Sequence, residues 1–99
     1  MTAQGQPRSR FRRAIERKNF LGAMTNAQDM GVVSLDEALD LVCLAAEVAP
    51  DRFDGFARRW LVRLATEKPL QVPELDLAVT ALRALPSQRA LAALRALIE

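Results

Sequence analysis

The prolines divide this chain into segments of about one helix each, and alanine and leucine fill much of the sequence between them. Proline lacks a backbone N–H and clashes with the turn before it, so a helix ends ahead of a proline or begins at one. Alanine and leucine are strong helix formers, whereas the aromatic residues that favour strands are few. The spacing therefore predicts an all-α protein with five to six short antiparallel helices arranged in hairpins.

Capping signals predict where these helices begin and end. Ser34 and Glu37 form a capping box, in which each side chain accepts a hydrogen bond from the other residue's backbone N–H. Gly31 is a typical helix stop, because glycine adopts the left-handed conformation that ends a helix. The other expected N-caps are Asn19, Asp51 and Ser87. The expected helices are Ser9–Lys18, Phe20–Met30, Leu35–Ala49, a fourth after Asp51 that ends near Lys68, a fifth that Pro73 opens and Leu85 ends, and a sixth from Ser87 to Ile98.

The chain length and the N-terminal sequence predict the domain organisation. A chain of 99 residues is long enough for one hydrophobic core but too short for two. Residues 1–8 are polar and basic, so we expect a disordered lead-in there and a single helical domain over residues 9–99. No apolar run approaches the roughly 20 residues of a membrane-spanning helix. The N-terminus also lacks the apolar middle segment of a secretory signal, which favours a cytoplasmic protein.

The sequence leaves two arrangements of the helices open. Sliding the chain by 36 residues superposes Pro50 on Pro86 and Leu41 on Leu77, a weak pattern of helix, proline and helix. Such a pattern is typical of a helical-repeat array, loosely like HEAT hairpins. The alternative is an irregular helical bundle, in which a sequence rich in alanine and leucine shows the same spacing by chance.

Residue types that enzymes and metal sites need are missing. The chain contains no histidine and no tyrosine, which removes the commonest general acid and base near neutral pH. Cys43 is the only cysteine, so neither an intrachain disulfide nor a structural zinc site can form. Carboxylates surround it in the sequence and disfavour a thiolate. We therefore expect a protein that is not an enzyme and that holds no cofactor or metal.

Charged residues of the third and fourth expected helices fall on narrow stripes. Two antiparallel helices joined near Pro50 place residues with a constant index sum opposite each other, and three acid–base pairs share the sum of 99. These pairs predict a structural ion-pair ladder: Asp36 with Arg63, Asp40 with Arg59, and Glu47 with Arg52. The third helix is expected to be central and largely buried. The expected core of the fourth helix consists of Phe53, Phe56, Trp60, Leu61 and Leu64.

Arginine-rich surfaces are the sequence features that point to a partner. The candidate basic surface consists of Arg8, Arg10, Arg12, Arg13, Arg17, Lys18 and Arg58. These residues favour a small non-enzymatic protein–protein interaction module that engages an acidic partner protein. The alternative is a small nucleic-acid-associated accessory protein, because a basic N-terminal helix can neutralise phosphates with little sequence preference. The oligomeric state stays open.

Three segments resemble a loose group of short all-helical bacterial proteins of uncharacterised function. They are Phe11–Arg17, Ser34–Leu39 and Arg58–Leu61, and the likeness extends over most of the chain after residue 10. The matching patterns are helix-forming patterns rather than chemical signatures. The resemblance implies a bacterial cytoplasmic source and a helical fold, and it transfers no catalytic or binding residue.

Overall fold

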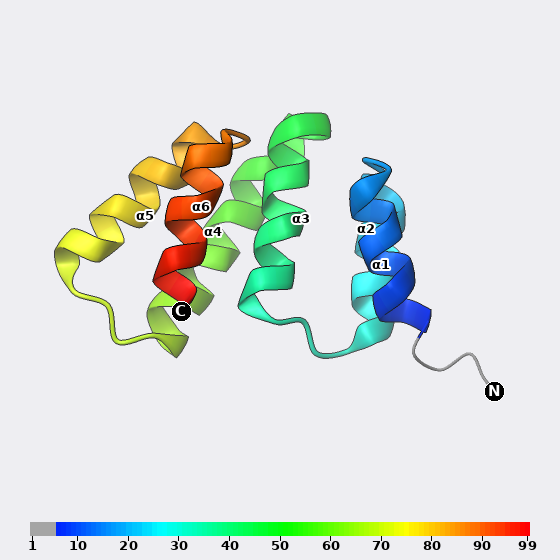
Figure 1. Cartoon of the computed structure of the whole chain (residues 1–99), viewed down its shortest axis with the longest axis horizontal. Helices are drawn as coiled ribbons and strands as arrows, with labels where there is room; N and C mark the ends of the chain where they lie inside the picture. The colour runs from blue at the N-terminus through cyan, green and yellow to red at the C-terminus, as the bar shows by residue number, and fades with distance from the viewer. Residues whose placement is uncertain (1–5) are drawn as a thin grey trace.

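The protein is all-α, as the proline spacing predicts. The computed structural model describes residues 6–99, which form six helices with no strand among them (Figure 1). The helices are α1 (Gln6–Glu16), α2 (Phe20–Met30), α3 (Leu35–Val48), α4 (Pro50–Glu67), α5 (Val72–Ala84) and α6 (Gln88–Ile98). Within residues 6–99, no helix combines the length and the apolar character that crossing a membrane requires.

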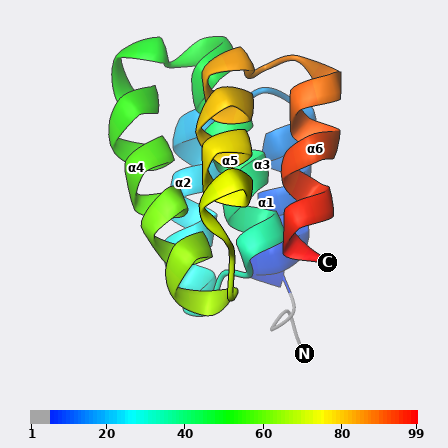
Figure 2. The ribbon, with the colours of Figure 1, turned by 90° about the vertical axis from the view of Figure 1, so that its left-hand side faces the viewer.

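Consecutive helices pair into three antiparallel hairpins, which follow one another along the molecule. The principal extents are 46 × 26 × 21 Å, with α1 and α2 at one end of the long axis and α5 at the other (Figure 1). Helix α3 contacts α1 on one side and α6 on the other, and α4 contacts α5. Seen along the long axis, α4 and α6 lie on opposite sides of α5 (Figure 2). This succession places α3 at the centre of the fold.

Local capping chemistry explains most of the helix boundaries. The range of α2 matches the predicted range at both ends, because the Asn19 side chain caps it and Gly31, at φ 79°, ends it. The Ser34–Glu37 capping box starts α3, with both reciprocal hydrogen bonds at 3.0 Å. The Ser87 hydroxyl accepts a hydrogen bond from the backbone N–H of Ala90 at the start of α6. These caps are confirmed.

The boundaries of α1 differ from the prediction at both ends. The helix begins at Gln6 rather than Ser9, so the expected disordered lead-in is wrong for residues 6–8, while residues 1–5 lie outside the described part of the chain. It ends at Glu16 rather than Lys18, because Lys18 takes a left-handed conformation at φ 60°. That turn directs the chain into α2.

The starts of α4 and α5 also differ from the prediction. Pro50 is the first residue of α4, so Asp51 lies within the first turn and Ala49 occupies the cap position. Proline is suited to the first helical position because its fixed φ is already helical. Helix α5 begins at Val72, and the Glu74 carboxylate accepts a hydrogen bond from the backbone N–H of Gln71 at 2.7 Å.

Two apolar clusters form the core, and α3 contributes to both. The larger cluster joins α3, α4, α5 and α6, and the smaller joins α1, α2 and α3. Trp60 fills the seam between α3 and α4, and its indole N–H donates to the backbone oxygen of Leu35 at 2.9 Å. The hydrogen bond satisfies the only polar atom of this buried side chain.

The predicted core of α4 is confirmed only in part. Trp60 and Leu64 are buried, but Phe53, Phe56 and Leu61 are only partly buried. Phe53 and Phe56 lie where the two apolar clusters meet, and the Phe56 ring packs edge to face against Phe20 of α2 at 5.4 Å. These two phenylalanines therefore bridge two hairpins, whereas Trp60 fills the seam within one.

Leu39→Ala tests whether α3 is the centre of the core. Leu39 is fully buried, so its truncation should lower the free energy of unfolding by about 2–5 kcal/mol, through lost burial and the cavity left behind. The matched control is Leu21→Ala, since Leu21 is 68% exposed and should change that free energy by at most about 0.5 kcal/mol. Urea denaturation measures both. Equal losses in the two variants would contradict a core centred on α3.

Candidate functional site

The acidic stripe of α3 faces α1 and α6 rather than α4. The Arg95 guanidinium of α6 bridges two of its carboxylates, donating from Nε to Asp36 at 3.0 Å and from Nη2 to Asp40. Lys18, in the turn after α1, donates to Glu47 at 3.0 Å. The stripe therefore links three hairpins through their charges.

The predicted ladder between α3 and α4 is wrong. Arg52 approaches the sulfur of Met24 at 3.4 Å, and Arg63 pairs with Glu67 on its own helix at 2.8 Å. The Arg59 guanidinium lies 4.9 Å from the centre of the Phe56 ring. None of the three arginines forms an ion pair with α3 in the described chain.

The error has a geometric cause. A constant index sum gives the height at which two residues lie along a hairpin, but not the direction in which their side chains point. Helix α3 meets α4 through apolar residues such as Leu35 and Leu39. Asp36 and Asp40 each follow one of these residues by a single position, which turns them about 100° away from the seam.

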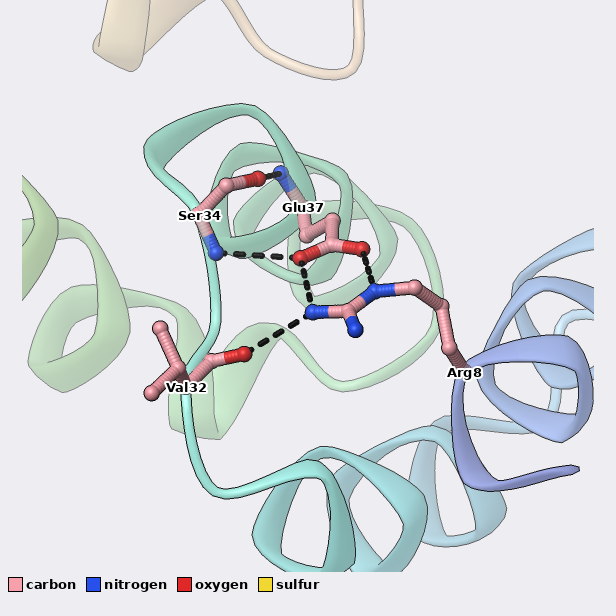
Figure 3. Close-up of polar contacts among 4 residues, drawn as sticks. All are labelled: Arg8, Val32, Ser34 and Glu37. Carbon is pink, nitrogen blue, oxygen red and sulfur yellow. Dashed lines mark hydrogen bonds and ion pairs between the residues drawn. The ribbon is translucent and has the colours of Figure 1, made fainter. Parts of the chain in front are cut away.

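Arg8 clamps α1 to the start of α3. Its guanidinium donates to both oxygens of Glu37, at 2.6 Å from Nε and 3.1 Å from Nη2, and Nη2 also donates to the backbone oxygen of Val32 at 2.9 Å (Figure 3). Glu37 simultaneously accepts from the backbone N–H of Ser34. The sequence reveals the capping box but not the arginine that joins it.

The surroundings of two α3 carboxylates move their pKa values in opposite directions. The hydrogen bond from Arg8 lowers the pKa of Glu37 from 4.5 to about 2. Burial raises the pKa of Asp40, although the charge of Arg95 opposes that rise. The folded protein favours the ionised form of Glu37, so this carboxylate stabilises the fold above about pH 4.5, and the stabilisation is lost as the pH falls. The folded protein favours the protonated form of Asp40, so its contribution to stability weakens as the pH rises through its pKa.

The structure divides the predicted basic surface into parts with different roles. Arg8 and Lys18 bind carboxylates of α3, and Arg12 lines a groove beside the acids of that helix. Arg10 and Arg13 of α1, together with Arg17 in the turn that follows it, line a shallow groove between α1 and α2, with a volume of about 240 Å³. Its lining residues are Arg10, Arg13, Ala14, Arg17, Asn19, Gly22 and Asn26. We call this surface the α1–α2 groove.

Arg58 belongs to a second groove, between α4 and α5. The α4–α5 groove has a volume of about 210 Å³, and most of its lining side chains are apolar. The lining residues are Phe53, Asp54, Ala57, Arg58, Leu61, Val79, Leu82 and Arg83. Sequence reasoning missed Arg83, because nothing in the local pattern shows that α5 packs beside Arg58.

Cys43 lies half-buried in a third groove, between α1, α3 and α6. Burial, followed by the negative charges of Glu47 and Asp40, raises the pKa of its thiol. A thiol in this setting stays protonated near neutral pH and is a poor nucleophile and metal ligand. Among the described residues, no cluster of three cysteine or carboxylate side chains has the arrangement of a metal site.

In comparisons with models of protein families, with curated proteins and with solved structures, nothing matches this chain. The resemblance to short bacterial helical proteins, and with it the cytoplasmic location, stays a prediction. The two arginine-lined grooves are the features from which a function can be argued.

A double-mutant cycle tests the observed pairing of the acidic stripe. Asp40→Asn combined with Arg95→Gln should show a coupling energy of about 0.5–1 kcal/mol, because the two side chains form a partly exposed ion pair. The control cycle pairs Asp40→Asn with Arg59→Gln, whose effects should add to within about 0.3–0.5 kcal/mol. Chemical denaturation provides the free energies. A larger coupling energy of Asp40 with Arg59 than with Arg95 would support the predicted ladder between α3 and α4.

The pH dependence of stability tests the Arg8 clamp. Glu37→Gln keeps an oxygen that can accept from Ser34 but removes the charge that Arg8 binds. The variant should melt below the wild type at neutral pH, and the gap should close as the pH falls from about 4.5 to about 2, where the wild-type carboxylate becomes protonated. Circular dichroism melts across this range measure the gap.

Glu74→Gln is the matched control for the clamp. Glu74 also accepts from an N-cap backbone N–H, but no arginine pairs with it in the described part of the chain. Its melting temperature should differ from that of the wild type by less than that of Glu37→Gln at neutral pH. If the melting temperature of Glu37→Gln differed from that of the wild type by the same amount at every pH, the charge pair between Arg8 and Glu37 would contribute nothing to stability.

Proposed function

We propose that this protein is a non-enzymatic interaction module that binds an acidic helical segment of a partner protein in the α4–α5 groove. The observation that carries the proposal is an apolar floor bordered by one arginine from each helix, Arg58 of α4 and Arg83 of α5. The absence of histidine and tyrosine from the chain supports a role without catalysis.

The floor of the groove suits the apolar face of a helix. Phe53, Leu61 and Val79 are all partly exposed there, between two helices that run antiparallel. An amphipathic helix binds such a groove through apolar side chains spaced three and four residues apart. The apolar floor therefore provides the contact area, and the two arginines provide the specificity for an acidic partner.

The charges on the rim favour carboxylates. Arg58 and Arg83 are exposed, and Asp54 is the one acid that lines the groove. Asp54 pairs with Arg58 at 3.0 Å, but both side chains are more than three-quarters exposed. An exposed pair of this kind is worth only about 0–1 kcal/mol, so a partner's carboxylate can compete for Arg58.

The size of the groove favours a protein segment over a small molecule. Pockets that bind small molecules or cofactors are commonly enclosed and about 300–1,000 Å³ in volume. The α4–α5 groove, at about 210 Å³, is smaller than that. A partner helix can instead lie across its length and leave the polar side of the helix in water.

The test is a titration with a labelled amphipathic peptide that carries leucines on one face and glutamates on the other. We expect binding with a Kd of about 10–100 μM, and a loss of at least about tenfold in the double variant Arg58→Glu, Arg83→Glu. Fluorescence anisotropy measures the affinity. The same peptide with lysines in place of the glutamates should not bind.

The matched control removes two arginines from elsewhere. Arg13→Glu, Arg17→Glu changes the net charge by the same amount but leaves the α4–α5 groove intact. This variant should bind the acidic peptide within about twofold of the wild type when salt screens long-range charge. Equal weakening in both double variants would show that net charge, and not the groove, attracts the peptide, and would reject the proposal.

A further inference from the structure

The α1–α2 groove presents a row of arginines that form no ion pair with the acids of the described residues. Arg10, Arg13 and Arg17 follow one another at the spacing of a single helix face, and all three side chains are exposed. No carboxylate lines this groove. Glu16, the acid of α1 itself, lines the groove on the opposite side of the helix, beside α3.

Asn26 of α2 holds the first guanidinium of the row in place. Its side-chain oxygen accepts a hydrogen bond from Nε of Arg10 at 3.1 Å, while its amide nitrogen donates to the backbone oxygen of Gly22 at 2.8 Å. The hydrogen bond to Asn26 occupies Nε and leaves the two terminal nitrogens of Arg10 available to a ligand. An arginine that is positioned before binding loses less side-chain entropy when the ligand arrives.

The chemistry of the groove suits phosphate better than a protein surface. Apart from Ala14, its lining side chains are arginines and asparagines, together with Gly22. The centre of a protein–protein interface is normally apolar, and among residues 6–99 this groove has no apolar lining side chain larger than a methyl group. Guanidinium groups bind phosphate oxygens in pairs with short, charge-assisted hydrogen bonds.

The spacing of the row matches a nucleic-acid backbone. Seven residues of helix separate Arg10 from Arg17, a rise of about 10 Å. Phosphates of one strand of a duplex follow at about 3.4 Å along the axis, so the row extends over about three phosphate steps, the length of four consecutive phosphates. Phe11, the aromatic residue of α1, is buried, which leaves no ring on this surface for a base to stack on.

We infer that the α1–α2 groove binds the phosphate backbone of a nucleic-acid duplex without regard to sequence. Arg10, Arg13 and Arg17 each neutralise one phosphate, and Asn26 positions the first of them. This site is separate from the α4–α5 groove and goes beyond the function proposed above, since its ligand is a polyanion and not an amphipathic protein segment.

The experiment measures binding of a labelled random-sequence DNA duplex by anisotropy at two salt concentrations. Three phosphate contacts predict that the association constant falls about 40-fold between 50 and 200 mM monovalent salt. In the double variant Arg13→Gln, Arg17→Gln, one contact remains, and the fall should be only about 3- to 4-fold. Both substituted side chains are exposed, and circular dichroism verifies that the helices are retained.

Arg58→Gln, Arg83→Gln is the matched control, because it removes two exposed arginines that line the α4–α5 groove and not the α1–α2 groove. This variant should keep the wild-type affinity for DNA and the wild-type salt dependence. A wild-type protein that does not bind the duplex at 50 mM salt would overturn the inference. So would equal affinities of the wild type and the Arg13→Gln, Arg17→Gln variant.

Two further ligands distinguish the phosphate backbone from other anions. Polyglutamate and vesicles of phosphatidylcholine with about 30% phosphatidylserine carry negative charge without a duplex backbone. We expect the α1–α2 groove to bind both at least about tenfold more weakly than the duplex at equal charge concentration. Suppose that polyglutamate or the vesicles bind as tightly as the duplex or more tightly, and that the Arg13→Gln, Arg17→Gln variant loses this binding. The groove would then be assigned to an acidic protein or to a membrane, and the nucleic-acid inference would be rejected. Failure here leaves the peptide titration at the α4–α5 groove unaffected.

Discussion

Helix α3 must bury most of its circumference, and the rest of the structure depends on that requirement. Its apolar residues enter both clusters, with Leu39 and Val42 in the larger and Leu41 and Leu44 in the smaller. Of its 14 residues, only Asp36, Glu47 and Val48 are exposed, so its exposed side is mainly acidic. Because neighbouring hairpins pack on either side of it, their basic side chains reach the stripe from α1 and α6. One helix thus sets both the core and the charge pattern.

This arrangement divides the basic residues into those that join neighbouring hairpins through ion pairs and those that line the two grooves. Arg8, Lys18 and Arg95 join hairpins through the acids of α3. The arginines of the two grooves form no ion pair between hairpins in the described chain, and they lie on different helices: those of the α1–α2 groove on α1 and the turn after it, and those of the α4–α5 groove on α4 and α5. The two proposals therefore place their ligands in separate grooves, one largely apolar and the other polar and basic.

The sequence predicts local structure well and the site only in part. Asn19, Ser34, Glu37 and Ser87 act within one helical turn, so their roles can be inferred from spacing alone. The sequence also indicates that the N-terminal arginines form the main basic surface, but it does not separate those that pair from those that stay free. That separation depends on which acids of α3 come within reach, and the chain brings those acids close only by folding.

The sequence alone determined the helical class and the capping chemistry, because helix propensity and caps act over distances of one turn. Only the tertiary structure decided that Asp36 and Asp40 pair with Arg95, 55 or more residues away, rather than with α4. The physical reason is rotational. Burial of the apolar residues fixes how each helix is rotated about its own axis. This rotation determines which oppositely charged side chains lie close enough to form ion pairs.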